Sequence, residues 1–248
     1  MKVSIITIVY NNHETIADAI ESVLNQTHPD IEYIVVDGMS NDGTVEVIRR
    51  YSNQITKFVS ESDNGLYDAI NKGIGLATGD VIGFLHSDDI FFSTESIAHV
   101  AAAFQANNTD SIYGDLIYVQ KSNTNKIVRT WISGKYKRES FLYGWMPPHP
   151  TFYVKREVYN KLGLYNTNFK SAADYELMLR YLYRFNLSTT YIPMKLVKMR
   201  VGGKSNITLK NRIRANQEDY KAWVTNNLKP PFYTRFLKPV RKLLQFLS

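Results

Sequence analysis

Apolar and polar positions alternate in blocks along the first half of the chain, and the blocks have two different periods. Short apolar runs bounded by turn residues predict strands buried on both faces, and apolar residues three or four positions apart predict helices. The predicted strands are Val3–Val9, Ile31–Val36, Lys57–Val59 and Val81–Leu85, and the predicted helices are His13–Leu24, Thr44–Tyr51 and Leu66–Ala77. Strands that alternate with helices predict a mostly parallel sheet with right-handed crossovers.

The second half of the chain has a less regular pattern. Strands are predicted at residues 111–119, 126–132 and 187–192, and helices after Ser171 and over residues 207–227. The first two of these strands are joined by a polar loop and predict a hairpin added to the sheet. Together the blocks predict one α/β unit over residues 1–205, with a central sheet flanked by helices, and a helical extension over residues 206–248.

Polar segments follow the predicted strands of the first half at their carboxyl ends. The segments are residues 10–12, 37–43, 60–65 and 86–89. In an open parallel sheet the carboxyl ends lie along one edge, and ligands bind in the crevice outside that edge. We therefore expect the four segments to form one ligand site.

Two adjacent carboxylates, Asp88 and Asp89, follow the last of these strands. Charges this close repel each other and burial raises the cost, so the pair requires a cation or several hydrogen-bond donors. A hard divalent ion such as Mg²⁺ or Mn²⁺, shared with the phosphates of a ligand, meets that requirement. The competing interpretation is a solvated turn in which one aspartate caps the next helix.

Composition narrows the class of protein. The chain has 248 residues and no cysteine, which excludes disulfides, thiolate metal sites and a cysteine nucleophile. No glycine-rich dinucleotide fingerprint follows the first strand, and no Walker A motif occurs. No secretory leader precedes Val3 and no apolar run has the length of a membrane span, so we expect a cytoplasmic protein.

Several segments, in their order along the chain, resemble the amino-terminal half of family 2 glycosyltransferases with the GT-A fold. The segments are residues 3–12, 25–27, 34–44 and 61–73. His86-Ser87-Asp88-Asp89 resembles the DXD-like metal motif of that family, and the resemblance extends from about Met1 to Gly203. It implies a nucleotide-diphospho-sugar transferase fold, with a nucleotide-binding half over residues 1–110 and an acceptor half over residues 111–205. It also implies sugar transfer from a nucleotide-activated donor, usually with inversion at the anomeric carbon.

The resemblance implies roles for residues around the base and ribose of the donor. Asp37 resembles the residue that accepts a hydrogen bond from a pyrimidine base, and Thr7 and Tyr10 would flank that base. Glu61 and Asp63 would face the base and the ribose. The alternative for Asp37 is a turn residue in an Asp-Gly segment.

The resemblance also implies roles around the phosphates. Lys72 would reach a phosphate, Asp88 would face the ribose or the metal, and Asp89 would be the direct ligand of Mn²⁺ or Mg²⁺. The alternative for Lys72 is a solvated lysine on the outer face of a helix.

Two residues of the second half are candidates for the acceptor side. His149 follows an aromatic-rich loop and resembles a family residue near the donor sugar or the acceptor, and a packed or capping histidine is the alternative. Asp174, in the first turn of a predicted helix, resembles the general base that deprotonates the acceptor hydroxyl. The alternative is that Asp174 only starts the helix and that Glu176 is the base or an ion-pair partner.

Paired glycines near residue 202 suggest a mobile loop. Arg200 and Lys204 flank them, and their cations would close over a diphosphate as a lid does. A simple connecting loop is the competing interpretation.

The end of the chain is basic. Six cations and no acid occur after Asp219, namely Lys221, Lys229, Arg235, Lys238, Arg241 and Lys242, and apolar residues recur among them at helical spacing. Such a helix is typical of peripheral contact with an anionic membrane on its cytoplasmic face. A helix docked on the catalytic domain or on a second subunit is the alternative, and an oligomer is left open.

These observations favour a metal-dependent, inverting glycosyltransferase that uses a UDP-linked sugar. The expected acceptor is a glycan or a polyprenyl-linked saccharide of cell-surface polysaccharide biosynthesis. The first alternative is a glycoside hydrolase with a carboxylate pair, which requires no nucleotide. The second is a noncatalytic basic binding module, but the net charge of +7 is concentrated in the tail and does not predict nucleic-acid binding.

Overall fold

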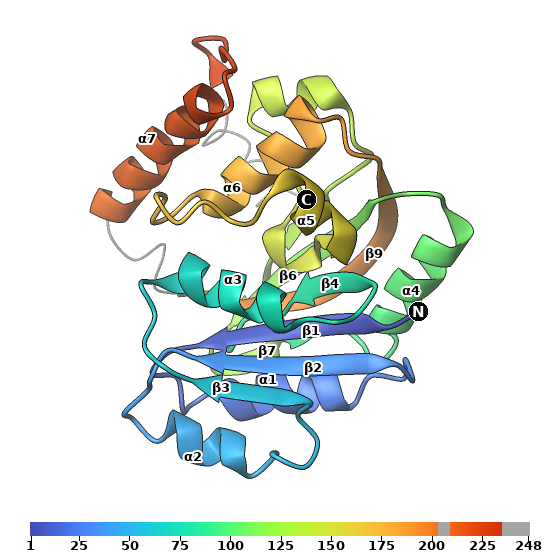
Figure 1. Cartoon of the computed structure of the whole chain (residues 1–248), viewed down its shortest axis with the longest axis vertical. Helices are drawn as coiled ribbons and strands as arrows, with labels where there is room; N and C mark the ends of the chain where they lie inside the picture. The colour runs from blue at the N-terminus through green and yellow to red at the C-terminus, as the bar shows by residue number, and fades with distance from the viewer. Residues whose placement is uncertain (203–208, 235–248) are drawn as a thin grey trace.

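A single mixed sheet organises residues 1–202 and 209–234, the part of the chain that the computed structural model describes (Figure 1). Its strands are β1 (Val3–Val9), β2 (Ile31–Asp37), β3 (Lys57–Ser60), β4 (Val81–Phe84), β5 (Ile90–Phe91), β6 (Ser111–Gln120), β7 (Asn123–Trp131), β8 (Tyr153–Lys155) and β9 (Thr189–Arg200). Their order is β3-β2-β1-β4-β8-β6-β9-β5, and β7 pairs with β6 beside this path. The first four strands in this order run parallel, as the alternating pattern predicts.

Helices cover both faces of the sheet (Figure 1). They are α1 (Ile16–Leu24), α2 (Thr44–Arg49), α3 (Leu66–Leu76), α4 (Ser96–Ala106), α5 (Arg156–Leu162), α6 (Ala173–Met178) and α7 (Leu209–Thr225). Three shorter helical turns accompany them in the described ranges, two of 3-10 type at Arg138–Tyr143 and His149–Thr151 and one of π type at Leu179–Arg184.

Residues along β1 alternate between two hydrophobic cores. Ile6 and Ile8 belong to the core shared with α3, α5 and α6, whereas Val3 and Ile5 belong to the core shared with α1 and α4. Successive strand residues point to opposite faces, so an apolar strand between two helical layers joins both cores. This double burial holds β1 in register with β2 and β4 and brings their carboxyl ends to one edge.

Gly83 on β4 is a position where a side chain is expected to destabilise the fold. A Cβ there would lie 2.2 Å from Cε1 of Tyr153, a fully buried ring on the neighbouring strand β8. We expect Gly83→Ala to lower the free energy of unfolding by about 3 kcal/mol, near the upper end of the usual cost of overpacking a core.

Gly75→Ala on α3 is the matched control for Gly83→Ala. Nothing lies within 4 Å of a Cβ built at this exposed helical position, so the change should raise stability by up to about 1 kcal/mol. Urea unfolding measures both variants. A Gly83→Ala protein as stable as the wild type would contradict the packing of Tyr153 against β4.

Several elements after β4 depart from the sequence pattern. The hairpin of β6 and β7 confirms the prediction, but α4, α5, β5 and β8 are not predicted. β9 continues to Arg200 rather than ending near residue 192, because it pairs with β6 on one side and β5 on the other. Lys195 and Lys198 interrupt the apolar alternation along this strand and hide its length in the sequence.

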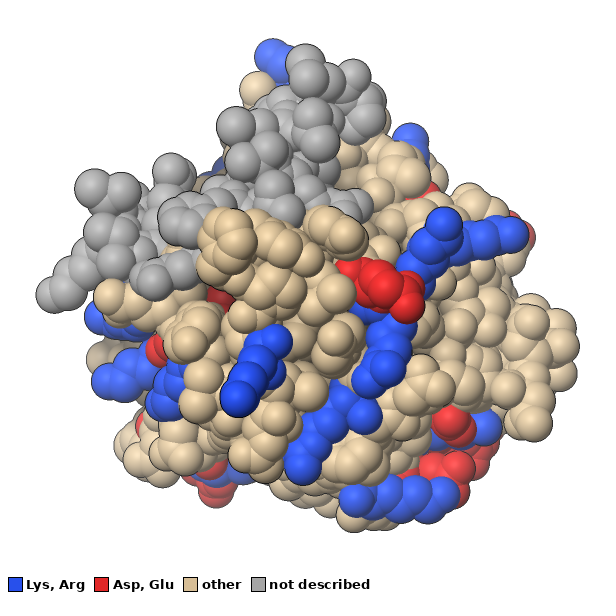
Figure 2. Space-filling model, turned by 90° about the horizontal axis from the view of Figure 1, so that it is seen from above, with Lys and Arg blue, Asp and Glu red and all other residues tan. Residues whose placement is uncertain are grey.

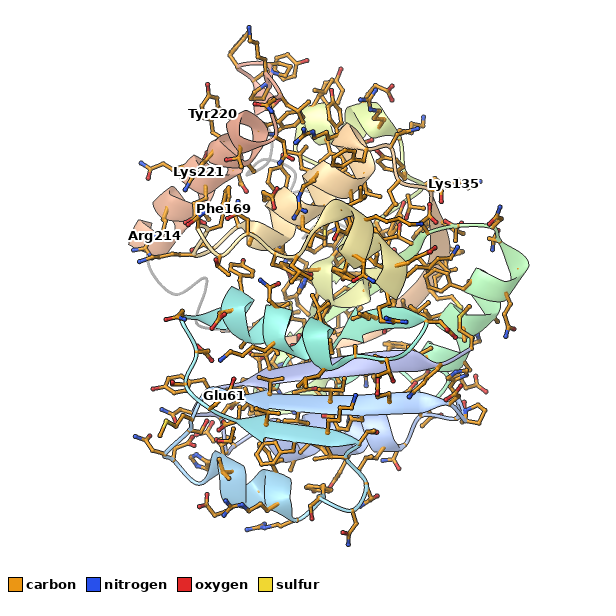
Figure 3. All side chains as sticks on the ribbon, in the orientation of Figure 1. Glu61, Lys135, Phe169, Arg214, Tyr220 and Lys221 are labelled. Atoms are coloured by element: carbon orange, nitrogen blue, oxygen red, sulfur yellow. The ribbon has the colours of Figure 1, made fainter. Side chains whose placement is uncertain are left out.

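α7 packs against α6 and the segment that precedes it. Trp223 Nε1 donates to the hydroxyl of Tyr175 at 2.9 Å, and Lys221 Nζ lies 4.9 Å from the centre of the Phe169 ring (Figure 3). This confirms the predicted helix over Leu209–Thr225, and residues 207 and 208 of the prediction lie outside the described residues. Lys204 and the predicted basic helix beyond residue 234 lie outside the described residues. None of the helices in the described ranges is long and apolar enough to cross a membrane.

Candidate functional site

Asp37 organises the turn that follows β2. Its carboxylate is buried and accepts hydrogen bonds from the backbone N of Ser40 at 3.0 Å, from Ser40 Oγ at 2.5 Å and from Ser60 Oγ at 2.6 Å. The ends of β2 and β3 are thereby tied together at the predicted site edge. Asp37 thus holds this turn together, and both of its oxygens accept hydrogen bonds there.

Tyr10, Gly38 and Asp63 converge beside this turn. A Cβ at Gly38 would lie 2.5 Å from Asp63 Oδ2 and 3.3 Å from Tyr10 Cδ2, so only glycine leaves room here. Asp63 Oδ1 accepts a hydrogen bond from the backbone N of Gly65 at 2.8 Å. The Tyr10 side chain is 56% exposed. An exposed ring beside a carboxylate offers a stacking surface and an acceptor for a planar heterocycle.

The structure does not bring Thr7 or Lys72 to an open site. Thr7 is fully buried and its hydroxyl accepts a hydrogen bond from Tyr33 at 3.1 Å. The Lys72 ammonium lies 3.0 Å from the Glu61 carboxylate and donates to the carbonyl of Ser62 at 2.8 Å (Figure 3 labels Glu61). Lys72 thus anchors the loop after β3 to α3, and Glu61 already has a cationic partner.

Asp88 and Asp89 lie in different environments after β4. The Asp89 side chain is 0% exposed, whereas Asp88 is half-buried. Burial, followed by the neighbouring Asp88 charge, raises the pKa of the Asp89 carboxyl well above its usual range. Asp89 Oδ1 accepts a hydrogen bond from the backbone N of Arg200 at 3.3 Å, and Oδ2 has no partner among the described atoms. The structure therefore favours Asp88 over Asp89 as the carboxylate within reach of a bound ion, the reverse of the predicted assignment.

Arg200 is part of the scaffold behind these aspartates and does not lie on a loop. It ends β9, is buried, and donates from Nη1 to the carbonyl of Asp88 at 2.9 Å and from Nη2 to the carboxylate of Asp18. The expected closing motion of this cation is wrong for Arg200 itself, because strand pairing and two hydrogen bonds hold it in place.

The donor set at residues 88 and 89 fits a divalent ion that a ligand helps to hold. In the described part of the chain no three His, Cys, Asp or Glu side chains are grouped so that they alone could hold a metal. Mg²⁺ is commonly held by one or two carboxylates together with substrate phosphates. A buried carboxylate oxygen without a partner, behind an accessible one, is consistent with a nearby cation.

A second accessible carboxylate, Asp174, comes from the start of α6. It is half-buried, and its Oδ1 lies 3.4 Å from the hydroxyl of Tyr67 on α3. Burial, then the charge of Asp174, raises the pKa of Tyr67 well above its usual range. Tyr67 therefore stays a neutral donor that orients this carboxylate.

Glu176 does not share this setting. It is buried, pairs with Arg180 Nε at 3.0 Å and accepts a hydrogen bond from Asn226 Nδ2 at 3.0 Å. Of the two alternatives for Glu176, the structure favours an ion-pair partner over a base.

His86 and His149 stack on each other beside Phe84 at the end of β4. His86 Nε2 lies 3.3 Å from His149 Nδ1, and His149 Nε2 lies 2.9 Å from the hydroxyl of Tyr165. Burial lowers the pKa of His86, and the charges of Asp88 and Asp174 oppose this change. Burial and His86 lower the pKa of His149 to about 3, so this ring is neutral at physiological pH.

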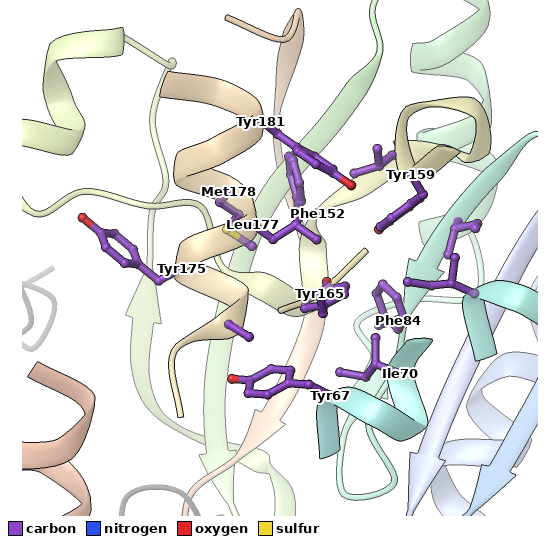
Figure 4. Close-up of a cluster of buried hydrophobic side chains, with 14 of the residues drawn as sticks. Tyr67, Ile70, Phe84, Phe152, Tyr159, Tyr165, Tyr175, Leu177, Met178 and Tyr181 are labelled. Atoms are coloured by element: carbon purple, nitrogen blue, oxygen red, sulfur yellow. The ribbon is translucent and has the colours of Figure 1, made fainter. Parts of the chain in front are cut away.

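Sequence reasoning missed the aromatic part of this network. Tyr67 and Tyr165 stack with ring centres 5.9 Å apart, and Figure 4 shows both beside α6. Tyr67 lies within the recognised segment 61–73, which could have identified it. Tyr165 lies in a loop without a motif, and only the fold places it beside His149.

Comparisons with known proteins agree on one family. Residues 4–168 match the family described as "Glycosyl transferase family 2". A Mycobacterium bovis protein named PGL/p-HBAD biosynthesis glycosyltransferase is 28% identical over 208 residues, which cover 82% of this chain and 78% of the relative. A Rickettsia typhi protein named as an uncharacterized glycosyltransferase is 29% identical over 256 residues and covers 99% of this chain and 77% of the relative.

Solved structures of low sequence identity share the fold. S. aureus TarS in complex with UDP-GlcNAc superposes with a TM-score of 0.69 at 18% identity, covering 91% of this chain. The chain spans 65% of that TarS structure. The mannosyltransferase PcManGT of Pyrobaculum calidifontis, in complex with GDP-Man and Mn²⁺, superposes with a TM-score of 0.66 at 19% identity. That match covers 99% of this chain and 69% of the PcManGT chain. These likenesses confirm the predicted mixed α/β, GT-A architecture.

Proposed function

This chain belongs to glycosyltransferase family 2, and on that basis we propose an inverting transferase that moves a sugar from a nucleotide diphosphate sugar to a hydroxyl group of its acceptor. The observation that carries the proposal is a chain of contacts from the segment of Asp88 to Asp174. His86, two residues before Asp88, lies 3.3 Å from His149, and His149 lies 2.9 Å from the Tyr165 hydroxyl. Tyr165 stacks on Tyr67, whose hydroxyl lies 3.4 Å from Asp174. If the diphosphate of the donor binds beside Asp88, the anomeric carbon of the donor sugar would lie on the side of Asp174.

The nucleotide is proposed to bind over Tyr10, Gly38 and Asp63. The exposed ring supplies a stacking face, and Asp63 Oδ2 faces the gap above Gly38 and is an acceptor for an N–H of the base. A uracil base has such a donor, and TarS provides a related fold in complex with UDP-GlcNAc. We therefore propose UDP-linked sugars first, with GDP-linked sugars as the second class to test.

Asp88 is proposed to hold a divalent ion, with Asp89 behind it. When bound, Mn²⁺ or Mg²⁺ would supply positive charge for the diphosphate leaving group. Arg200 holds the Asp88 carbonyl and the Asp89 carboxylate from the far side, so both acids keep their places without a ligand.

Asp174 is proposed as the general base. It would accept the proton of the acceptor hydroxyl as that oxygen attacks the anomeric carbon from the face opposite the diphosphate. The hydroxyl of Tyr67 orients one carboxylate oxygen, which leaves the other for the acceptor. His86 would offer its Nδ1 to a sugar hydroxyl, and His149, which is engaged through both ring nitrogens, would orient the His86 ring.

The acceptor is proposed to be a glycan or a polyprenyl-linked saccharide of cell-surface polysaccharide biosynthesis. A relative of this chain is named PGL/p-HBAD biosynthesis glycosyltransferase, which supports an acceptor that is an intermediate of a biosynthetic route. Peripheral contact with the cytoplasmic face of a membrane through residues 235–248 is part of the same proposal.

Release of free nucleotide from a panel of nucleotide sugars, with Mn²⁺ and with a chelator, tests the proposed function. We expect slow hydrolysis of one UDP-sugar or GDP-sugar that requires the ion. Cleavage of a simple glycoside that is independent of nucleotide and resistant to the chelator would contradict the proposal and favour the carboxylate-pair hydrolase.

A further inference from the structure

Three exposed aromatic side chains lie at the end of the molecule farthest from the parallel strands. Phe232 is 84% exposed, Tyr143 is 49% exposed and Phe185 is 47% exposed. Large apolar side chains that are this accessible are uncommon on a monomer when they are grouped. None of the three belongs to the proposed transfer site.

Ring contacts and a hydrogen bond join Tyr143 and Phe232 into one surface. The Tyr143 ring stacks on Tyr233 at 5.9 Å, and Tyr233 lies edge-on to Phe232 at 5.7 Å. Thr234 Oγ1 donates to the carbonyl of Leu142 at 2.6 Å, which fixes the segment after α7 against the turn 138–143.

The third aromatic side chain is joined to the same surface through α7 and the turn 138–143. Arg184, next to Phe185, lies 3.5 Å from Asn226 Oδ1 at the end of α7. Arg138 Nε donates to the carbonyl of Tyr183 at 2.9 Å. We call Tyr143, Phe185, Phe232, Arg138, Arg184 and Lys229 the aromatic-cation surface.

The charge of this surface is positive. Arg138, Arg184 and Lys229 are exposed, and Glu139 is the acid that accompanies them. The Arg184 guanidinium lies 5.0 Å from the centre of the Phe185 ring, so cation and aromatic ring are presented together. Figure 2, which looks onto this end, shows Lys and Arg side chains scattered among uncharged ones, with some acidic side chains between them.

We propose that the aromatic-cation surface binds the headgroup region of an anionic lipid bilayer. Aromatic rings prefer the interface between water and hydrocarbon, and neighbouring cations are attracted to anionic headgroups. Residues 235–248, which follow Thr234 in the sequence, carry four cations and no acid. The proposal concerns folded residues of three separate elements and does not depend on the transfer reaction.

Charge complementarity decides between a lipid surface and the other occupants. A second copy of this chain would bring the same cations against themselves, which is unfavourable. The residues after Thr234 are also basic and apolar. Their apolar side chains would suit this surface, but their cations would be repelled by its cations.

Sedimentation of the full chain with vesicles tests the proposal. Vesicles of phosphatidylcholine with added phosphatidylglycerol should bind the protein, and vesicles of phosphatidylcholine alone should bind it much more weakly. Arg184→Gln combined with Lys229→Gln should lower the partition coefficient about 25-fold, since each cation near an anionic surface contributes about a fivefold factor. Phe232→Ser with Phe185→Ser should lower binding without changing its salt dependence.

Phe92→Ser is the matched control. Phe92 is also an exposed ring beside two cations, with Lys195 and Lys198 at 5.8 and 5.7 Å, but it lies on another face next to β9. Its binding should equal that of the wild type.

Three outcomes would overturn the proposal. The first is that Phe92→Ser loses as much vesicle binding as the aromatic variant, or that the charge variant binds vesicles like the wild type. The second is that the aromatic variant loses thermal stability but binds vesicles like the wild type, which would assign the surface to the chain's own tail. The third is that the wild-type protein is retained on heparin but does not bind vesicles, which would assign the surface to a soluble polyanion.

Discussion

Asp174→Asn is expected to lower kcat by roughly a hundredfold or more, because an amide cannot accept the proton of the acceptor hydroxyl. Binding of the nucleotide sugar should stay near that of the wild type, since the Asp174 carboxylate accepts from the Tyr67 hydroxyl and is not among the residues proposed to hold the nucleotide. Steady-state kinetics with a competent acceptor, together with nucleotide binding by calorimetry, measure both quantities. Unchanged turnover would remove Asp174 from the mechanism.

Glu176→Gln is the matched control for Asp174→Asn. Glu176 lies two positions along the same helix, but its carboxylate is buried against Arg180 and Asn226. Removing one partner of a buried ion pair lowers stability, so this variant should unfold at lower urea while the folded protein keeps its turnover. A larger loss of turnover in Glu176→Gln than in Asp174→Asn would instead identify Glu176 as the base.

Asp88→Asn is expected to abolish the response of activity to Mn²⁺ or Mg²⁺. The half-buried carboxylate of Asp88 is the accessible member of the pair, and an amide is a much poorer ligand for a hard cation. A titration of activity against metal concentration measures the effect. We expect no stimulation in this variant at concentrations that saturate the wild type.

Asp89→Asn separates the two aspartates. Its amide would keep an oxygen for the backbone N of Arg200, so we expect a folded protein that still responds to metal at higher concentration. Full loss of the metal response in Asp89→Asn, with a normal response in Asp88→Asn, would restore Asp89 as the direct ligand.

Most of the parallel half could be predicted from the sequence because local and global preferences agree there. β1 and β2 are apolar on both faces, and each is followed by a helix with an apolar stripe, so periodicity alone places them. In the second half the deciding interactions are distant in sequence. β8 has three residues and exists because it lies between β4 and β6, and the polar part of β9 is held by β5.

The candidate site was predictable to the extent that it follows strand ends. Tyr10, Asp63 and Asp88 lie at the expected edge. Thr7 could not be placed correctly, because the alternation of β1 turns its side chain toward the buried core with Tyr33. The partners of Lys72 and Arg200 were also invisible in the sequence, since Glu61 and Asp18 become their neighbours only in the fold.

Calorimetric titration of UDP and GDP into the protein, with Mn²⁺ and with a chelator, tests the central claim most directly. That claim is that Asp88 and Asp89 tolerate each other because a divalent ion joins them to a nucleotide diphosphate. We predict binding of one nucleotide that depends on Mn²⁺ in the wild type and in Asp174→Asn, and that loses this dependence in Asp88→Asn. Equal affinity with and without the ion in the wild type, or no binding of either nucleotide, would contradict the claim.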